Sequence, residues 1–192
     1  MTGMRKGLQL CAAAVAACLA LALPALDAHA NGDEGQEEPA LAAGFRKGRV
    51  TGFPVPRFVS LKAARAHMRV GPSTDYPASW IYSAHGLPLE ITEEYGNWRR
   101  VRDHEGNTGW MFAPLLSGNR TAVVGPWMKQ PLALRSGPSR NARVVARLAP
   151  EVRLNLHRCD GTWCEVSLQQ RRLRGSVEQG SLWGVYPGES VE

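Results

Sequence analysis

Short runs in which apolar and polar residues alternate fill the chain from residue 57 onward, and Gly, Pro, Asn and Asp separate them. In the clearest run, Leu87, Leu89 and Ile91 occupy every second position. A period of two residues is typical of a strand with one buried face, and the breakers between runs are typical of turns. No run has the period of about 3.6 residues that a long amphipathic helix needs. The pattern therefore predicts an all-β protein.

Each half of this region contains five or six predicted strands. In the first half they cover residues 57–61, 66–70, 79–83, 87–92, 98–102 and 108–112, with a single 3₁₀ turn over 113–116. In the second half they cover residues 132–135, 143–148, 152–156, 164–168 and 173–177, with a polar turn at 169–172. So many short strands favour a small closed or nearly closed barrel, because an open sheet would expose its edges.

The two halves carry the same motifs in the same order. The motif G-x-W-x-x-V at residues 96–101 recurs at residues 161–166, and R-x-G-P-S at residues 69–73 recurs at residues 135–139. A repeat of this length is long enough for each copy to fold as a domain. We therefore expect one domain at residues 57–118, a connector at 119–130 and a second domain at 131–188.

The beginning of the chain predicts export. Residues 1–30 have the features of a secretory signal peptide, namely a basic start, the apolar run Leu8–Leu23 and an A-x-A site at Ala28–Ala30. A membrane anchor is an alternative, although the run is shorter than the roughly 20 residues of a spanning helix. Lipidation of Cys18 in a lipobox-like sequence is another. Residues 31–56 are predicted to be a disordered leader. We expect a periplasmic or secreted protein without stable membrane insertion after cleavage.

Signal cleavage would leave two cysteines, Cys159 and Cys164, on the two sides of a predicted hairpin turn. Residues that face each other across a hairpin have Cα atoms about 4.5 to 5.5 Å apart, which suits a disulfide. Two free thiols are the alternative, and a zinc site is disfavoured because zinc usually takes four ligands. Glu94 and Arg99 occupy the matching positions of the first copy. We therefore predict a disulfide in the second domain only.

No constellation of residues in the sequence indicates catalysis. The histidines are scattered, and the neighbouring carboxylates Glu93 and Glu94 should point to opposite sides of a strand. The polar triplet Asp103–Glu105 contains a histidine, but it lies at a predicted hairpin tip, where polar residues are ordinary. We therefore expect no enzyme, no metal site and no cofactor. The net charge is +6, but we expect no nucleic-acid partner because the chain is exported.

Taken together, these motifs resemble bacterial SH3-like (SH3b-type) domains of exported proteins. The R-x-G-P-S pair, the G-x-W-x-x-V pair and the dipeptide Gly109-Trp110 carry the resemblance, which spans residues 57–188. The resemblance implies two tandem SH3-like barrels that act as a non-catalytic binding module of the cell envelope, with peptidoglycan or its stem peptide as partner. An adaptor that binds another envelope protein is the alternative.

Aromatic residues of the first copy are the candidate ligand contacts. Trp98 and Trp163 occur in both copies, so we expect them to pack in the cores. Trp80 and Trp110 correspond to Ala146 and Ser176 in the second copy, and a site residue tolerates such a loss better than a core residue does. Tyr76 lies in a long loop that resembles the specificity loop of SH3-like folds. The predicted ligand-binding residues are Arg69, Tyr76, Trp80 and Trp110.

Arginine is abundant in the second copy, where residues 121–192 contain more basic than acidic side chains. Such a charge would attract an anionic partner such as a cell-wall polymer or lipid head groups, through a long-range field that salt screens. An ordinary solvated face is the alternative.

Overall fold

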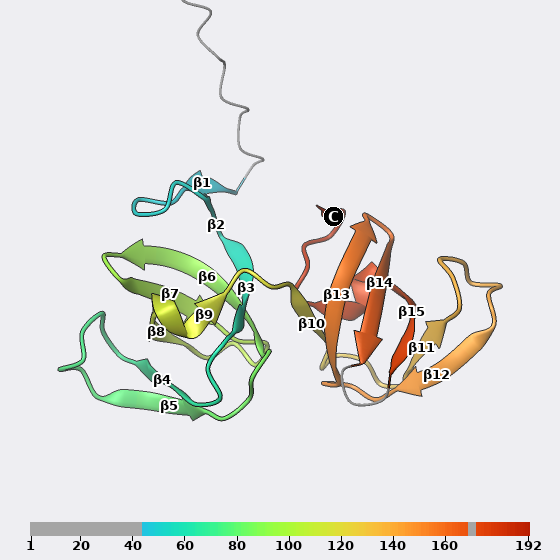
Figure 1. Cartoon of the computed structure of the whole chain (residues 1–192), viewed down its shortest axis with the longest axis horizontal. Helices are drawn as coiled ribbons and strands as arrows, with labels where there is room; N and C mark the ends of the chain where they lie inside the picture. The colour runs from blue at the N-terminus through green and yellow to red at the C-terminus, as the bar shows by residue number, and fades with distance from the viewer. Residues whose placement is uncertain (1–43, 169–171) are drawn as a thin grey trace, which may run out of the picture. The chain divides into compact units, whose positions relative to one another are not determined.

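The computed structural model describes residues 44–168 and 172–192 (Figure 1). The expected signal peptide, the lipidation of Cys18, the leader up to residue 43 and residues 169–171 of the predicted turn lie outside the described residues. Residues 39–192 form one compact unit. Within the described part of this unit, no helix is long and apolar enough to cross a membrane.

The first barrel is a curled antiparallel sheet of seven strands (Figure 1). Its elements are β3 (Arg57–Leu61), β4 (Ala66–Arg69), β5 (Ala78–Tyr82), β6 (Pro88–Tyr95), β7 (Trp98–Arg102), β8 (Thr108–Phe112), the 3₁₀ turn η1 (Ala113–Leu115) and β9 (Leu116–Ser117). The order of its strands is β5-β4-β8-β7-β6-β3-β9. The prediction of an all-β protein is confirmed.

The second barrel repeats this arrangement. Its elements are β10 (Thr121–Val124), β11 (Leu132–Arg135), β12 (Val144–Leu148), β13 (Arg153–Asp160), β14 (Trp163–Leu168), β15 (Leu173–Glu178), the 3₁₀ turn η2 (Gln179–Ser181), β16 (Leu182–Trp183) and β17 (Ser190–Val191). The strand order is β12-β11-β15-β14-β13-β10-β16, and β17 pairs with β13.

Part of the predicted connector is a strand of the second barrel, β10. We assigned residues 119–130 to a linker, yet all four residues of β10 are buried, and the strand pairs with β13 and β16. Its apolar run Ala122–Val124 does not alternate with polar residues, because the strand is buried on both faces. The period of two residues that marks the other strands is therefore missing here, and the sequence pattern does not predict this strand. The second barrel thus begins about ten residues before the predicted boundary.

Each sheet folds around its own apolar core. The fully buried side chains of the first core include Leu61, Met68, Leu89, Val101 and Met111. Those of the second core include Ala122, Leu134, Leu154, Val166 and Val177. Most of these residues alternate with exposed or half-buried neighbours along their strands, as the sequence pattern predicts.

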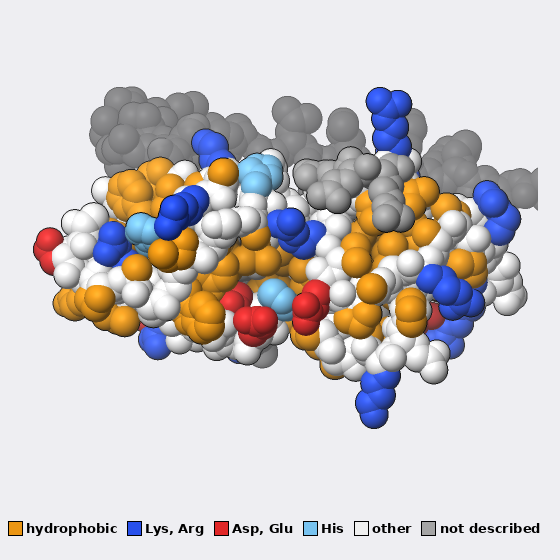
Figure 2. Space-filling view, turned by 90° about the horizontal axis from the view of Figure 1, so that it is seen from below, with side chains coloured by type: hydrophobic (Ala, Val, Ile, Leu, Met, Phe, Trp, Pro, Cys, Tyr) orange, Lys and Arg blue, Asp and Glu red, His pale blue; other side chains and the backbone are white. Residues whose placement is uncertain are grey.

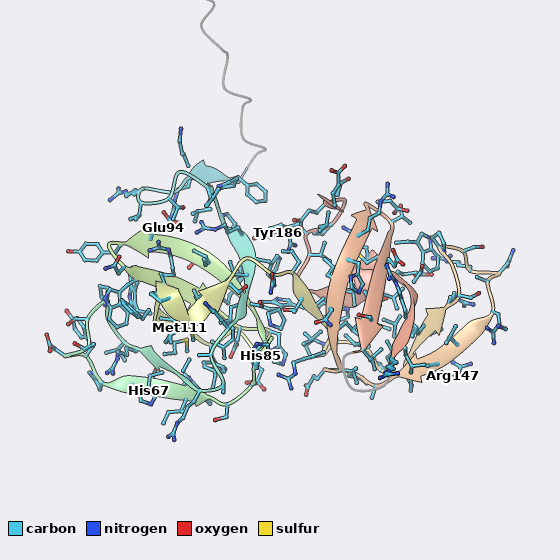
Figure 3. The ribbon with its side chains drawn as sticks, in the orientation of Figure 1. His67, His85, Glu94, Met111, Arg147 and Tyr186 are labelled. Atoms are coloured by element: carbon cyan, nitrogen blue, oxygen red, sulfur yellow. A yellow bond between two sulfur atoms is a disulfide. The ribbon has the colours of Figure 1, made fainter. Side chains whose placement is uncertain are left out.

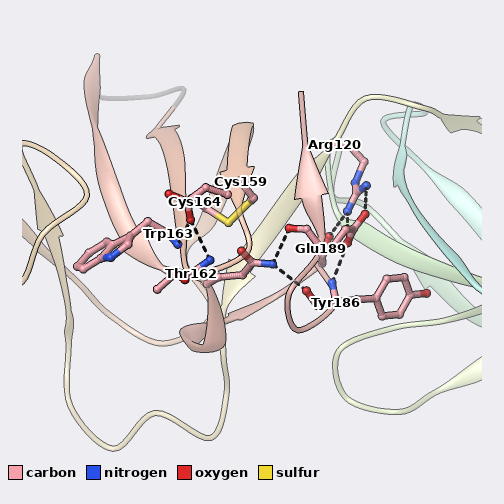
Figure 4. Close-up of a disulfide and its surroundings, with 10 residues drawn as sticks. Arg120, Cys159, Thr162, Trp163, Cys164, Tyr186 and Glu189 are labelled. Carbon is pink, nitrogen blue, oxygen red and sulfur yellow. Dashed lines mark hydrogen bonds and ion pairs between the residues drawn. A yellow bond between two sulfur atoms is a disulfide. The ribbon is translucent and has the colours of Figure 1, made fainter. Parts of the chain in front are cut away.

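The disulfide predicted between Cys159 and Cys164 is present (Figure 4). The two residues face each other across the hairpin of β13 and β14, with their Cα atoms 4.1 Å apart, and both belong to the second core. The hairpin of β6 and β7 pairs Glu94 with Arg99 at the equivalent place. One barrel therefore has a covalent cross-link where the other has two charged side chains.

The Glu94 side chain is fully buried and collects hydrogen bonds from distant parts of the chain (Figure 3). Its Oε2 accepts the backbone N–H groups of Val50 and Thr51 at 2.9 and 3.0 Å. Its Oε1 accepts the Thr51 hydroxyl at 2.6 Å and Arg57 Nη2 at 2.7 Å, and Arg99 Nε lies 3.7 Å away. Burial opposes the charged form, but these donors outweigh it and lower the pKa of Glu94 from 4.5 to about 2.

Part of the predicted disordered leader is ordered, because it binds the Glu94 carboxylate. Residues 44–56 are described and contain a two-stranded hairpin of β1 (Arg46–Lys47) and β2 (Pro54–Val55). The hairpin is fastened to the first barrel through Val50 and Thr51, and Val55 is buried. Few apolar residues mark this segment, so composition alone suggested disorder. Its order comes from bonds to a residue more than 40 positions later.

The two barrels also contact each other within the compact unit. The Phe58 ring of β3 lies 5.0 Å from Trp183 and 4.7 Å from Tyr186 between ring centroids. The Tyr186 hydroxyl donates to Glu90 Oε1 of β6 at 3.0 Å. Glu189 accepts from Arg120 Nη1 at 2.7 Å and from the Tyr186 backbone N–H at 2.8 Å, and these bonds shape the segment after β16 (Figure 4).

Removing the disulfide should weaken the second barrel modestly. The double variant Cys159→Ala and Cys164→Ala should lower the free energy of unfolding by about 2 kcal/mol, because so short a loop restricts the unfolded chain only slightly. Urea unfolding measures the loss. The unreduced native protein should resist thiol alkylation at both positions and have a mass two protons lower than the reduced protein, and labelling at both positions would contradict the bridge.

The Glu94 network should make the first barrel sensitive to acid. The pKa of Glu94 is lower in the folded protein than in the unfolded chain, so ionisation of Glu94 stabilises the fold. This stabilisation is fully present above pH 4.5 and is lost as the pH falls toward about 2. The contribution should be about 3 kcal/mol at neutral pH. Urea unfolding at a series of pH values should show Glu94→Gln destabilised by about this amount at pH 7, with the difference from the unaltered protein shrinking at low pH.

A matched control for this prediction is the neighbouring Glu93→Gln. Glu93 is half-exposed, and its ion pair with Arg100 is 3.6 Å long. A surface pair of this kind contributes little, so Glu93→Gln should change stability by less than about 1 kcal/mol. Equal losses in the two variants, or a Glu94→Gln deficit that does not depend on pH, would contradict the assigned role of Glu94.

Candidate functional site

The candidate site is a groove on the outer face of the first barrel. Strand β8 provides part of this face. Gly109 and Met111 of β8 are buried, so Trp110 and Phe112 point to the opposite, outer face. A Cβ atom on Gly109 would lie 2.8 Å from the backbone oxygen of Arg69. Glycine therefore allows β8 to approach β4 closely, and this approach pairs Trp110 with Arg69.

Strand β7 adds a second row to this outer face. Trp98 pairs with Phe112 and Arg100 pairs with Trp110, so the four side chains lie in two facing pairs. The ring centroids of Trp98 and Phe112 are 5.6 Å apart, and Tyr95 contacts Trp110 edge-on at 6.5 Å. The outer face thus presents aromatic rings beside guanidinium groups.

The groove beside these rings has a volume of about 650 Å³. It lies between β4, the loop after it and the outer face of β7 and β8. Its lining consists of Arg65, Ala66, His67, Arg69, Thr74, Trp98, Phe112 and Leu115. None of these lining residues is acidic, whereas two are arginines. The volume is in the range of ligand-binding pockets, and the groove joins apolar rings to cationic groups.

The predicted ligand-binding residues are only partly brought together. Arg69 pairs with Trp110, and its Nη1 donates to the backbone oxygen of Tyr76 at 2.6 Å, so these three residues are neighbours. Trp80 instead pairs with the buried Met68. Because cross-strand partners share a face, the Trp80 ring lies on the other side of the β4–β5 ladder from Arg69 and remains half-exposed.

Sequence reasoning missed several residues of the groove. Trp98 and Trp163 were predicted to pack in the cores, but both are half-buried, and neither belongs to a buried cluster. The inward positions of β7 belong instead to Arg99, which faces Glu94, and to Val101. Alternation along β8 could have predicted Phe112, because a residue two positions after Trp110 lies on the same face of the strand. His67 and Arg65 had no sequence signal.

The second barrel does not reproduce this aromatic face. Trp163 pairs with Glu178 instead of a phenylalanine, and Ser176 takes the place of Trp110, as the repeat predicted. Glu178 also accepts from Arg140 Nε at 2.8 Å. Lys and Arg side chains protrude singly at several points of the surface in Figure 2. Among the arginines of this barrel, Arg140, Arg153 and Arg158 each line a different cavity.

The polar triplet at the β7–β8 turn has a structural role. Asp103 is buried, and its Oδ1 accepts the backbone N–H groups of Glu105 and Asn107 at 3.0 and 2.8 Å. Its Oδ2 accepts the Tyr82 hydroxyl at 2.7 Å, and burial together with this bond raises the pKa of Tyr82. Across the described ranges, no group of three or more His, Cys, Asp and Glu side chains is placed to hold a metal ion.

Trp110 should be dispensable for folding, because it points away from the core. We expect Trp110→Ser, which introduces the residue of the second copy, to lower the free energy of unfolding by less than about 1 kcal/mol. The neighbouring variant Met111→Ser should lose about 3 kcal/mol or more, since it empties a core position and buries a hydroxyl. Urea unfolding with far-UV circular dichroism measures both, and equal losses would show that Trp110 is structural.

Comparison with solved structures finds distant likenesses. An NlpC/P60 family protein from Bacillus cereus ATCC 10987 is 15% identical, with a TM-score of 0.30, over 66% of this chain and 55% of that one. The structure of NlpC1 from Trichomonas vaginalis is 13% identical, also with a TM-score of 0.30, over 74% of this chain and 50% of that one. The chain thus spans about half the length of each protein. No curated protein matches the chain.

A sequence model of the bacterial SH3 domain matches the chain twice, at residues 62–118 and 128–184, which together make up more than half of it. The two matches each cover most of one curled sheet, leaving out β3, β10 and β17, and they confirm the prediction of tandem SH3-like domains. The chain therefore belongs to the bacterial SH3 domain family.

Proposed function

We propose that this protein is a non-catalytic binding module of the cell envelope, and that its ligand is peptidoglycan or the stem peptide of peptidoglycan. The observation that carries the proposal is the groove of the first barrel, in which Trp98 and Phe112 lie beside Arg65, His67 and Arg69. Aromatic rings with arginine are the side chains on which binding energy concentrates at interfaces.

The chemistry of the groove fits a cell-wall ligand. Indole and phenyl rings offer flat apolar surfaces for sugar rings or aliphatic side chains. Arg65 and Arg69 offer donors for carboxylates, and stem peptides carry carboxylates. The absence of acidic side chains from the lining leaves this positive field uncompensated within the groove. Residues 1–30 resemble a signal peptide, so we place the protein in the periplasm or outside the cell.

An adaptor that binds another envelope protein is the second candidate, and strand β5 favours it. This strand lies at the end of the first sheet, with β4 as its partner in the described residues. Four of its five residues are exposed, and the side chains of Trp80 and Ile81 are about half-exposed. An exposed apolar edge strand can accept an extended segment of another protein by β-strand addition.

Retention on purified peptidoglycan tests the first candidate. The whole chain should be retained at both about 0.05 M and about 1 M NaCl, because aromatic contacts survive screening whereas contacts made by exposed arginines do not. The double variant Tyr76→Ala and Trp110→Ala should bind at least about 30-fold more weakly, and the double variant Trp98→Ala and Phe112→Ala should behave likewise.

Trp127→Ala is the matched control, since Trp127 is half-exposed and lies between β10 and β11 of the second barrel, whereas Tyr76 and Trp110 adjoin the groove residue Arg69. Circular dichroism should show that every variant remains folded. If the groove variants bind as the unaltered protein does, the site lies elsewhere. If the unaltered chain is not retained at either salt concentration, the adaptor function is favoured, and Trp80→Ala then tests the edge strand.

A further inference from the structure

A second concave site lies within the compact unit, away from the aromatic groove. Two cavities of about 240 and 360 Å³ share four lining residues, His85, Gly86, Thr121 and Asn155, so they form one continuous cleft. His85 belongs to the turn between β5 and β6, whereas Thr121 and Asn155 pair with each other on β10 and β13 (Figure 3). Both barrels therefore contribute to its walls.

The charge of this cleft has one sign. Its basic lining residues are Lys62, His85, Arg120, Arg153 and His157, and no acidic residue lines either cavity. Arg153 Nη1 donates to the backbone oxygen of His85 at 2.9 Å, and this bond places a guanidinium across the cleft. Outside the lining, Glu189 accepts from both Nη1 and Nη2 of Arg120 and so compensates the charge of that arginine.

Neutral polar side chains in the lining also favour a ligand that accepts hydrogen bonds. Ser60, Ser117 and Asn119 line the cleft and have side chains that can donate hydrogen bonds. Two buried side-chain atoms of further lining residues, Arg120 Nε and Thr121 Oγ1, have no hydrogen-bond partner among the described residues. A buried donor without a partner costs free energy, so a ligand that orders water or side chains here would relieve that cost.

We propose that this cleft binds a small oxyanion, either a phosphate or a carboxylate group. The donors and positive charges on both walls suit an ionised oxygen acceptor, for which charge-assisted hydrogen bonds are strong. A cation would meet only like charges in the lining, and an apolar ligand would leave the donors unsatisfied. The site is independent of the aromatic groove, because the two share no lining residue.

Titration with inorganic phosphate, followed by amide chemical shifts of the whole chain, tests the proposal. We expect saturable shifts centred on residues 85–86, 119–121 and 153–157. Lys62→Gln is the informative variant, because within residues 44–168 and 172–192 its side chain makes no hydrogen bond or ion pair that the fold would lose. It should weaken phosphate binding at least about 5-fold, and adding Arg153→Gln should weaken it further, to about 30-fold in total.

The matched control is the double variant Lys129→Gln and Arg147→Gln, which removes the same charge from exposed residues outside the cleft. It should bind phosphate as the unaltered protein does. A parallel titration with acetate identifies the oxyanion: saturation by acetate at the same amides assigns a carboxylate ligand, and saturation by phosphate alone assigns a phosphate ligand.

Two results would overturn the proposal. One is the absence of saturation by either anion up to about 50 mM, which corresponds to no useful affinity. The other is a set of shifts spread over the exposed arginines of the second barrel, weakened equally by the control variant, which would indicate screening of surface charge only. Neither result would affect retention on peptidoglycan, because that retention is assigned to residues of the separate groove.

Discussion

The charge of Glu94 is the constraint around which the first barrel is arranged. A buried carboxylate must be matched by donors, and this one takes them from Val50 and Thr51, from Arg57 and from Arg99. The N-terminal hairpin, the start of β3 and the β6–β7 hairpin therefore meet at one ion. The second barrel places a disulfide at the equivalent pair, and a disulfide demands no further partners. The first barrel therefore holds the N-terminal hairpin at this place, whereas in the second barrel the C-terminal strand β17 pairs with Cys159 and Asp160 of β13.

The same constraint orients the candidate site. Arg99 faces inward because it approaches Glu94, and alternation along β7 then sends Trp98 and Arg100 outward. There they meet Phe112 and Trp110 of β8. In the second barrel the inward Cys164 likewise sends Trp163 outward, but its partner is Glu178, whose carboxylate is engaged by Arg140. A tryptophan repeated in both copies thus belongs to the shared geometry of the hairpin, while its partners decide whether an aromatic groove forms.

Much of the fold could be predicted from local pattern, because alternation, turn residues and an internal repeat are short-range signals. The repeat even predicted that Cys159 and Cys164 occupy the positions of Glu94 and Arg99. The errors came where the deciding contact was distant or the alternation was absent. The order of residues 44–56 depends on Glu94, and β10 is buried on both faces. Among the groove residues, Arg69 was found through the repeat, as was Trp110 beside the groove, whereas His67 and Arg65 join it only through the curl of the sheet.

Two of the ionisable groups that join these parts, Glu94 and Tyr186, keep one charge state over the pH range in which proteins usually work. Burial and the nearby charge of Glu90 raise the pKa of Tyr186, so its hydroxyl remains a donor to Glu90 between the barrels. The pKa of Glu94 is about 2, so the N-terminal hairpin remains fastened at any mildly acidic pH. A switch needs a group that titrates near its working pH. The connections at Glu94 and Tyr186 therefore keep their hydrogen bonds over this pH range and are not switches.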